Sequence, residues 1–318
     1  MEDSDRSGLS ESSDFSGGSV ESGSQVVERD LTMVNIQLSE KTREIIERFT
    51  TIYGQKKIDK EGLNATTELI WVSPSNYTAW SFRRQIINKL KIDLRDELDF
   101  VSNVLRENQK NYQGWYHRSK IVEKLNDYTK ELQFTAEILE LDNKNYHAWQ
   151  YRHWLLNQTQ GWTNEMSYVE FMLTNDVYNN SAWHQRYQTF LKTKGLNDDS
   201  INSEIVYTFQ KLDTHIDNEA AWNYLFGLIP RGRFKDYISI LEQVQKLVDT
   251  HTNACRFVHD FLVQFRIGLL EEKYGDVEEL KSLIGKDCDI LSNKLDTLRK
   301  GYWKYVKTTL DQRIPCGF

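Results

Sequence analysis

Along the chain, apolar side chains recur three and four positions apart, which is the spacing of one face of an α-helix. Four such series begin at an acidic residue and place apolar or threonine side chains one, four and eight positions later. Their first residues are Glu97, Glu131, Glu165 and Glu204. A second kind of series begins at a tryptophan and continues seven positions later with Ile87, Val122, Leu156 and Phe190. The two kinds alternate, so the pattern predicts pairs of helices.

A five-residue motif opens each tryptophan series. Its copies read NYTAW, NYQGW, NYHAW, NNSAW and NEAAW, within the segments 76–86, 111–121, 145–155, 179–189 and 218–228. The asparagine before each run suits a helix N-cap, because its side-chain oxygen can accept a backbone N–H from the first turn. The Ala or Gly before each tryptophan would let a neighbouring helix approach closely. The tryptophans lie 35, 34, 34 and 39 residues apart, a period typical of helical solenoids.

The spacing of the landmarks predicts how the helices are joined. Each of the four glutamates lies eighteen residues before a tryptophan, whereas the interval from tryptophan to the next glutamate varies from 16 to 21 residues. We therefore expect the extra residues in a loop within a hairpin, around LKTKGLNDDSIN, since loops tolerate insertions. We also expect each glutamate to start its helix, where the helix dipole favours an acid.

These patterns predict an all-α fold, a right-handed α-α superhelix in which helical hairpins form a crescent solenoid. Residues 37–318 would form one helical-repeat domain, with a less regular first hairpin at about 40–90 and capping helices in 230–318. Three prolines and sixteen glycines in 318 residues agree with long helices. Residues 1–36 are rich in serine, glycine and acid, and we expect a disordered tail there.

Charge and cysteine content narrow the classes of function. The net charge is −7, and residues 1–30 account for most of it, so the repeats are nearly neutral and nucleic-acid binding is not favoured. The three cysteines, Cys255, Cys288 and Cys316, are far apart, which suits reduced thiols. No apolar run is long enough for a membrane span, and no signal peptide is recognisable. We expect a cytoplasmic protein.

Candidate chemistry gathers where two of the tryptophan helices begin. The segments KNYQ (110–113) and KNYH (144–147) each combine a cation, an amide and a phenol. A helix start beside a lysine suits an anion such as phosphate; the alternative is that Lys110 and Lys144 are merely solvated. For the repeated tryptophans, and for the arginines that follow them as W-x-x-R, packing and ion pairs with neighbouring helices are favoured over ligand contact. The sequence contains no metal-ligand motif, nucleophile triad or glycine-rich phosphate loop, so alone it does not look like a complete enzyme.

The segments KNYQGWYHR, KNYHAWQYRHW and DVYNNSAWHQRY resemble the repeat of the α subunits of protein prenyltransferases, and LDTLRKGYWKYV resembles their C-terminal helix. The likeness is firm over about 70–230 and loose elsewhere. Within that family, the NYQ and NYH repeats are most similar to the subunit shared by farnesyltransferase and type I geranylgeranyltransferase.

The resemblance implies a subunit that is inactive until it wraps around a β subunit. The β subunit, and not this chain, would hold a zinc ion, and magnesium could accompany the diphosphate. The reaction would transfer farnesyl or geranylgeranyl from its diphosphate to the cysteine of a C-terminal CaaX motif. Lys110 and Tyr112 map onto catalytic positions and Gln113 onto the residue that holds the peptide carboxylate. The remaining substrate-binding positions are Lys144, Asn145, Tyr146 and His147.

Two other functions fit the same sequence. One is the α subunit of the Rab-directed geranylgeranyltransferase, which needs an escort protein and acceptors that end in two cysteines. The other is a non-enzymatic scaffold, similar to tetratricopeptide-repeat proteins, that binds peptides.

Overall fold

The computed structural model describes residues 38–251 and 255–313, and the predicted tail of 1–36 lies outside the described residues. Within them, regular structure is helical throughout. The α-helices are α1 (Glu40–Gly54), α2 (Lys60–Val72), α3 (Tyr77–Leu90), α4 (Leu94–Glu107), α5 (Tyr112–Leu125), α6 (Glu131–Leu141), α7 (Tyr146–Thr159), α8 (Glu165–Asn175), α9 (Asn180–Thr193), α10 (Asp198–Thr214), α11 (Glu219–Leu228), α12 (Ser239–Thr250), α13 (Arg256–Glu271), α14 (Val277–Ile290), α15 (Lys300–Thr308) and α16 (Leu310–Arg313). The chain divides into the units Met1–Glu44 and Ile45–Phe318, and the second is described below.

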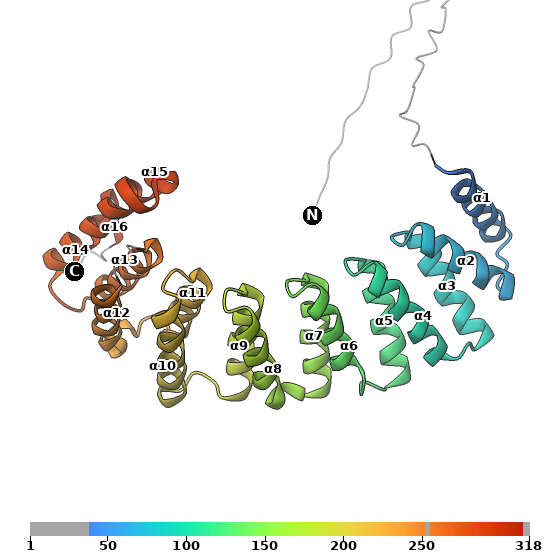
Figure 1. Ribbon diagram of the computed structural model, residues 1–318, viewed down its shortest axis with the longest axis horizontal. Coiled ribbons are helices and arrows are strands. Elements are labelled where there is room, and N and C mark those ends of the chain that lie inside the picture. Colours follow the sequence, from blue (N-terminus) through green and yellow to red (C-terminus); the bar gives the residue numbers. More distant parts are fainter. Residues whose placement is uncertain (1–37, 252–254, 314–318) are drawn as a thin grey trace, which may run out of the picture. The chain divides into compact units, whose positions relative to one another are not determined.

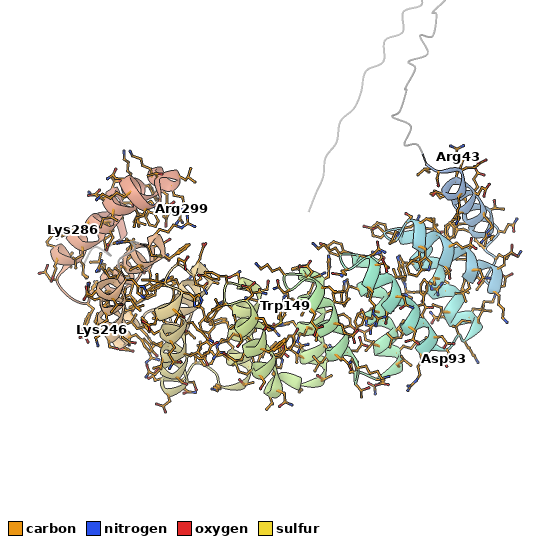
Figure 2. The ribbon with its side chains drawn as sticks, viewed as in Figure 1. Arg43, Asp93, Trp149, Lys246, Lys286 and Arg299 are labelled. Atoms are coloured by element: carbon orange, nitrogen blue, oxygen red, sulfur yellow. The ribbon has the colours of Figure 1, made fainter. Side chains whose placement is uncertain are left out.

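Successive helices from α2 to α11 form five antiparallel hairpins in chain order (Figure 1). Each tryptophan helix (α3, α5, α7, α9 and α11) packs against the helix that precedes it, and contacts between tryptophan helices join α3 to α5, α5 to α7 and α9 to α11. The predicted all-α solenoid is confirmed. Five buried tryptophans anchor the hairpins: Trp80, Trp115, Trp149 (Figure 2), Trp183 and Trp222. Their predicted packing role is therefore confirmed.

The small residue before each tryptophan is needed for packing. Ala79, Ala148, Ala182 and Ala221 are inaccessible to solvent. At the equivalent position in α5, a Cβ on Gly114 would lie 2.9 Å from Leu105 Cδ2 of α4. The predicted close approach is therefore seen at Gly114, and the four alanines are buried as such packing requires.

The position of the extra residues was predicted wrongly. Because the packed hairpins pair a glutamate helix with the tryptophan helix after it, the segment around Lys194 joins two hairpins. Most of the insertion is also helical: it extends α10 at its N-terminus to Asp198, and Ile201 in that extension is buried.

The predicted role of the glutamates at helix starts is only partly correct. Glu131 and Glu165 are the first residues of α6 and α8, but Glu97 and Glu204 lie further inside α4 and α10. The four side chains share burial instead, each being less than 4% exposed. A buried carboxylate must be paired, and the partner is the arginine of the W-x-x-R motif.

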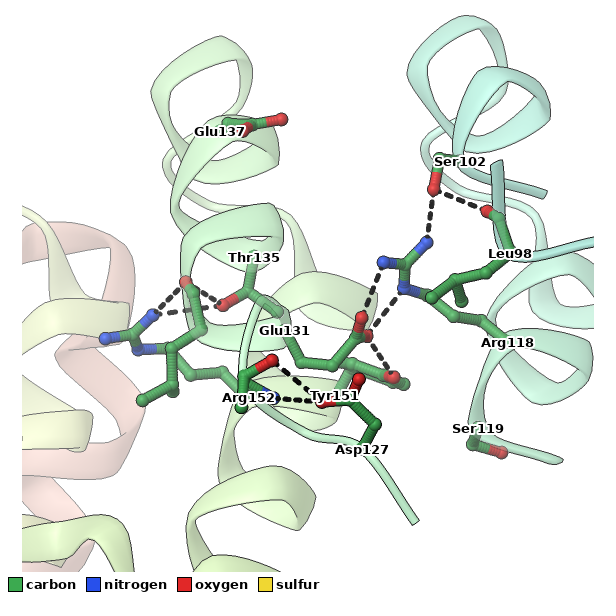
Figure 3. Close-up of polar contacts among 12 residues, drawn as sticks. Leu98, Ser102, Arg118, Ser119, Asp127, Glu131, Thr135, Glu137, Tyr151 and Arg152 are labelled. Atoms are coloured by element: carbon green, nitrogen blue, oxygen red, sulfur yellow. Dashed lines mark hydrogen bonds and ion pairs between the residues drawn. The ribbon is translucent and has the colours of Figure 1, made fainter. Parts of the chain in front are cut away.

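The arginine and glutamate pairs connect consecutive hairpins. Arg118 donates from Nε and Nη2 to the Glu131 carboxylate at 2.7 and 2.8 Å, and from Nη1 to Ser102 Oγ at 2.6 Å (Figure 3). Tyr151, from the next tryptophan helix, donates to the same carboxylate at 2.6 Å. The equivalent arginine pairs are Arg83 with Glu97, Arg152 with Glu165, and Arg186 with Glu204. The expected structural role of these arginines is confirmed.

Candidate functional site

The starts of the tryptophan helices lie beside one another because a shared acceptor joins each hairpin to the next. Each tryptophan indole donates to the backbone carbonyl six residues earlier, as Trp115 Nε1 does to Gln109 at 2.7 Å. The cap asparagine of the following hairpin donates its amide to that same carbonyl. The carbonyls that accept both bonds belong to Pro74, Gln109, Asn143 and Val177. The motif therefore aligns the helix starts along one edge of the hairpins.

The start of α5 presents the first group of predicted site residues. Asn111 caps the helix and accepts the backbone N–H groups of Gln113 and Gly114 at 2.9 and 3.1 Å. The Lys110 side chain is 78% exposed and lies 3.3 Å from the Asp142 carboxylate. Tyr112 is exposed and Gln113 is half-buried. The Lys110 ammonium and the Tyr112 phenol are therefore accessible to a ligand.

The start of α7 repeats this arrangement one hairpin later. Lys144 is exposed, with its ammonium 3.8 Å from the Asp176 carboxylate, and Tyr146 is exposed. Asn145 is 1% exposed. Its oxygen accepts the N–H groups of His147 and Ala148 at 3.0 and 3.1 Å. The geometry gives Asn145 a capping role, and its predicted contact with substrate stays a prediction.

The two helix starts meet through aromatic rings. Tyr112 and His147 pack edge to face with ring centroids 4.2 Å apart, and the Tyr146 ring also contacts His147 edge to face, at a centroid distance of 5.6 Å. Partial burial, followed by the nearby Lys110 ammonium, lowers the pKa of His147 below its ordinary value of 6.5. The imidazole is therefore neutral near pH 7, and one of its nitrogens can donate while the other accepts.

Cavities lie between successive tryptophan helices below this edge. One of about 380 Å³ is lined by Tyr112, Tyr116, His147 and Tyr151, among others. A second, of about 530 Å³, includes Lys144, Tyr146, His153 and His184 in its lining. Both combine aromatic rings with polar side chains that could orient a ligand.

Sequence reasoning missed some of these lining residues. Tyr116 and Gln150 each follow a motif tryptophan and are exposed beside the cavities. Their place in the repeat could have revealed them. In a helix, the residue directly after each motif tryptophan faces away from the hairpin core. Asp142 was missed too, although it lies two residues before Lys144 and its carboxylate contacts Lys110.

No group of three or more His, Cys, Asp or Glu side chains in 38–251 or 255–313 is arranged to hold a metal ion. No helix in these ranges has the length and apolar character to cross a membrane.

The repeats match a known family model. "Protein prenyltransferase alpha subunit repeat" matches residues 59–90, 94–125, 128–159, 162–193 and 201–231, which together make up half of the chain. The chain belongs to the protein prenyltransferase alpha subunit family. The matched segments correspond to the five hairpins from α2 to α11.

Relatives within the prenyltransferase alpha subunits support the finer resemblance. The protein farnesyltransferase/geranylgeranyltransferase type-1 subunit alpha of Pisum sativum is 34% identical over 302 residues, covering 88% of this chain and 89% of that protein. The subunit of the same name from Schizosaccharomyces pombe is 37% identical over 82 residues, which are 26% of this chain and 28% of that protein.

A solved prenyltransferase has the same fold. A chain of the Candida albicans protein geranylgeranyltransferase-I complexed with GGPP is 27% identical, with a TM-score of 0.74 over 86% of this chain and 92% of that chain. The relatives named here are subunits of enzymes.

Proposed function

We propose that this chain is the α subunit of a heterodimeric CaaX prenyltransferase, which transfers farnesyl or geranylgeranyl from its diphosphate to a cysteine thiolate. The observation that carries the proposal is the contact between Tyr112 and His147 on the edge where Lys110 also lies. Two separate repeats there contribute groups that the resemblance assigns to the same reaction centre.

Lys110 supplies positive charge to the leaving group. As the C–S bond forms at C1 of the isoprenoid, the bond from C1 to the diphosphate oxygen breaks and negative charge grows on the diphosphate. An exposed ammonium held near that oxygen stabilises the transition state more than the ground state. The weak, partly exposed contact of Lys110 with Asp142 leaves it able to turn toward an anion.

The neighbouring polar groups position the substrates. Tyr112 offers a phenol O–H beside the same centre, and neutral His147 supports its ring. Gln113, at the first turn of α5, is the residue that would hold the peptide carboxylate. Lys144 and Tyr146 would extend the same edge toward the diphosphate by one hairpin. Asn145, which caps α7, would hold the backbone of these substrate-binding positions.

The remaining chemistry would come from outside this chain. A zinc ion held by the β subunit would lower the pKa of the acceptor cysteine, and magnesium could accompany the diphosphate. This chain on its own would then be inactive.

The deciding experiment combines the full chain with a prenyltransferase β subunit and measures transfer from each isoprenoid diphosphate to a fluorescent CaaX peptide. The proposal expects transfer by the heterodimer and none by either subunit alone. A matched peptide whose cysteine is replaced by serine should remain unmodified.

The alternatives give different results in the same assay. Transfer only to acceptors ending in two cysteines, and only with an escort protein, would assign the Rab-directed enzyme. A stable lone chain that ignores isoprenoid diphosphates and assembles with no β subunit would assign a peptide-binding scaffold and end the proposal.

A further inference from the structure

A third cavity, of about 330 Å³, lies between the tryptophan helices α9 and α11, which contact each other. Its lining includes three aromatic residues, Trp183, Tyr187 and Tyr224. Asn180 and His184 line this cavity and also the cavity of about 530 Å³ described above. The third cavity therefore continues the same series one hairpin further from Lys110.

The three rings of this cavity lie at different angles to one another. The planes of Tyr187 and Tyr224 meet at 87° with centroids 6.2 Å apart, and Trp183 is tilted by 52° to Tyr224 at 5.0 Å. Each ring has already used its only donor. Tyr224 donates its O–H to the buried Glu204 carboxylate at 2.6 Å, and the other two rings donate to backbone carbonyls. The rings therefore offer π-electron surface to an occupant, but no free O–H or N–H.

The exposed part of the lining is polar but carries no fixed charge. Apart from Gly227, it consists of Asn180, His184 and Asn223, whose side chains make no hydrogen bond with any described residue. Amide oxygens and a neutral imidazole nitrogen can accept from an N–H donor. No lysine, arginine or acid among the described residues lines this cavity, whereas a lysine lines each of the other two.

We propose that the cavity between α9 and α11 binds a cationic side chain, an arginine or a lysine, of the β subunit. This inference rests on the proposed function, because it requires a partner that covers the tryptophan helices. Aromatic rings attract a cation most strongly where water is excluded, and the acceptors at the opening can take its N–H groups. An anion would meet no positive side chain here. An apolar side chain would leave the polar groups at the opening without partners.

The charge at position 184 tests which kind of side chain enters the cavity. His184 is exposed, so substitution there should leave the fold intact. Calorimetry measures the Kd for the β subunit of His184→Glu, His184→Gln and His184→Lys near pH 7. A cationic occupant predicts the tightest binding for His184→Glu and the weakest for His184→Lys, with about 10-fold between them. Equal Kd values or the reverse order would overturn the proposal.

Gln150 is the matched control for this series. It is exposed and, like His184, directly follows a motif tryptophan, but it lies outside the lining of this cavity. Gln150→Glu and Gln150→Lys should not reproduce the order expected at position 184. The same order at both positions would show a charge effect of the whole face and overturn the cavity as the binding site.

A second pair of variants tests the aromatic ring. Tyr187→Leu keeps apolar volume without a π system and should raise the Kd about 3- to 30-fold, whereas Tyr187→Phe should stay within about twofold of wild type. Equal Kd values for these two folded variants would overturn the cation site alone. Failure of the wild-type chain to assemble with any β subunit would overturn the proposed function together with this inference.

Discussion

Asn145 Nδ2 and Trp115 Nε1 donate to the same oxygen, the backbone carbonyl of Gln109, at 3.4 and 2.7 Å. One residue belongs to the cap of α7 and the other to the core of the preceding hairpin. The repeat motif therefore does two things at once: it starts its own helix, and it fixes the position of that start against the hairpin before it. The alignment of Lys110 and Tyr146 on one edge follows from this bond pattern.

Asn145→Ala should destabilise the chain by about 1–3 kcal/mol, because it removes the cap of α7 and the bond to the Gln109 carbonyl. Urea unfolding followed by circular dichroism measures the loss. Asn223→Ala is the control, since Asn223 is exposed on a tryptophan helix. If Asn145→Ala unfolds at the wild-type urea concentration, the capping role is wrong. Reduced transfer by a fully folded heterodimer would instead favour the predicted substrate contact.

Glu131→Gln should cost about 3–5 kcal/mol, because it leaves the buried guanidinium of Arg118 without its counter-charge. The carboxylate is 1% exposed and accepts from Arg118 and Tyr151 (Figure 3). Glu137→Gln is a matched change on the same helix: that side chain is exposed and its contact with Arg106 is 3.3 Å long. We expect this control to cost less than about 1 kcal/mol. Equal unfolding free energies for the two variants would contradict the proposed importance of the buried pairs.

Much of the fold could be predicted from the sequence because the signals repeat. Asparagine caps and buried tryptophans each occur in five copies, and a structural role that fits one copy can be checked against the other four. The placement of Tyr112 near His147 followed from the same period. The extension of α10 could not be predicted in this way, since it occurs once. In the folded chain Ile201 is buried, and the exposed Asn197 caps the extension by accepting the backbone N–H of Ser200.

The second partners of the buried glutamates were also beyond sequence reasoning. Each glutamate accepts from the residue two positions after the next tryptophan, and that residue varies: it is His117, Tyr151, Gln185 or Tyr224. These side chains all have a hydrogen-bond donor, but they are not similar in hydropathy or size. Their common role depends on geometry between hairpins, which a pattern of apolar positions does not contain.

The stability of the chain should fall as the pH falls below 6.5, in part through His117. This imidazole is inaccessible to solvent, its Nε2 lies 2.7 Å from Glu97, and its Nδ1 has no partner among the described residues. Burial lowers its pKa below the ordinary 6.5. Because the folded-state pKa is the lower one, the unfolded chain binds more protons below pH 6.5. The contribution of neutral His117 to the free energy of unfolding is therefore complete above pH 6.5. It is lost as the pH falls from 6.5 toward the folded-state pKa.

His117→Gln should reduce this loss of stability between pH 6.5 and 5. Glutamine is already used at the equivalent position, where Gln185 donates to Glu165 at 2.9 Å. Burial also lowers the pKa values of His147 and His153, so the measurement is the difference in slope between variants. His184→Gln, an exposed change, serves as the control. Parallel pH profiles for wild type and His117→Gln would exclude the buried histidine as a source.

Lys110→Ala should slow transfer by about one to three decades while leaving the heterodimer assembled, because it removes a charge aimed at the departing diphosphate. Single-turnover kinetics with pre-bound isoprenoid diphosphate isolate that step. Lys89→Ala is the matched control, since Lys89 is exposed in the last turn of α3, at the opposite end of a hairpin. Asp142→Asn removes the partner that lies 3.3 Å from Lys110, and it should keep the rate near that of wild type. A wild-type rate for Lys110→Ala would place the leaving-group charge elsewhere.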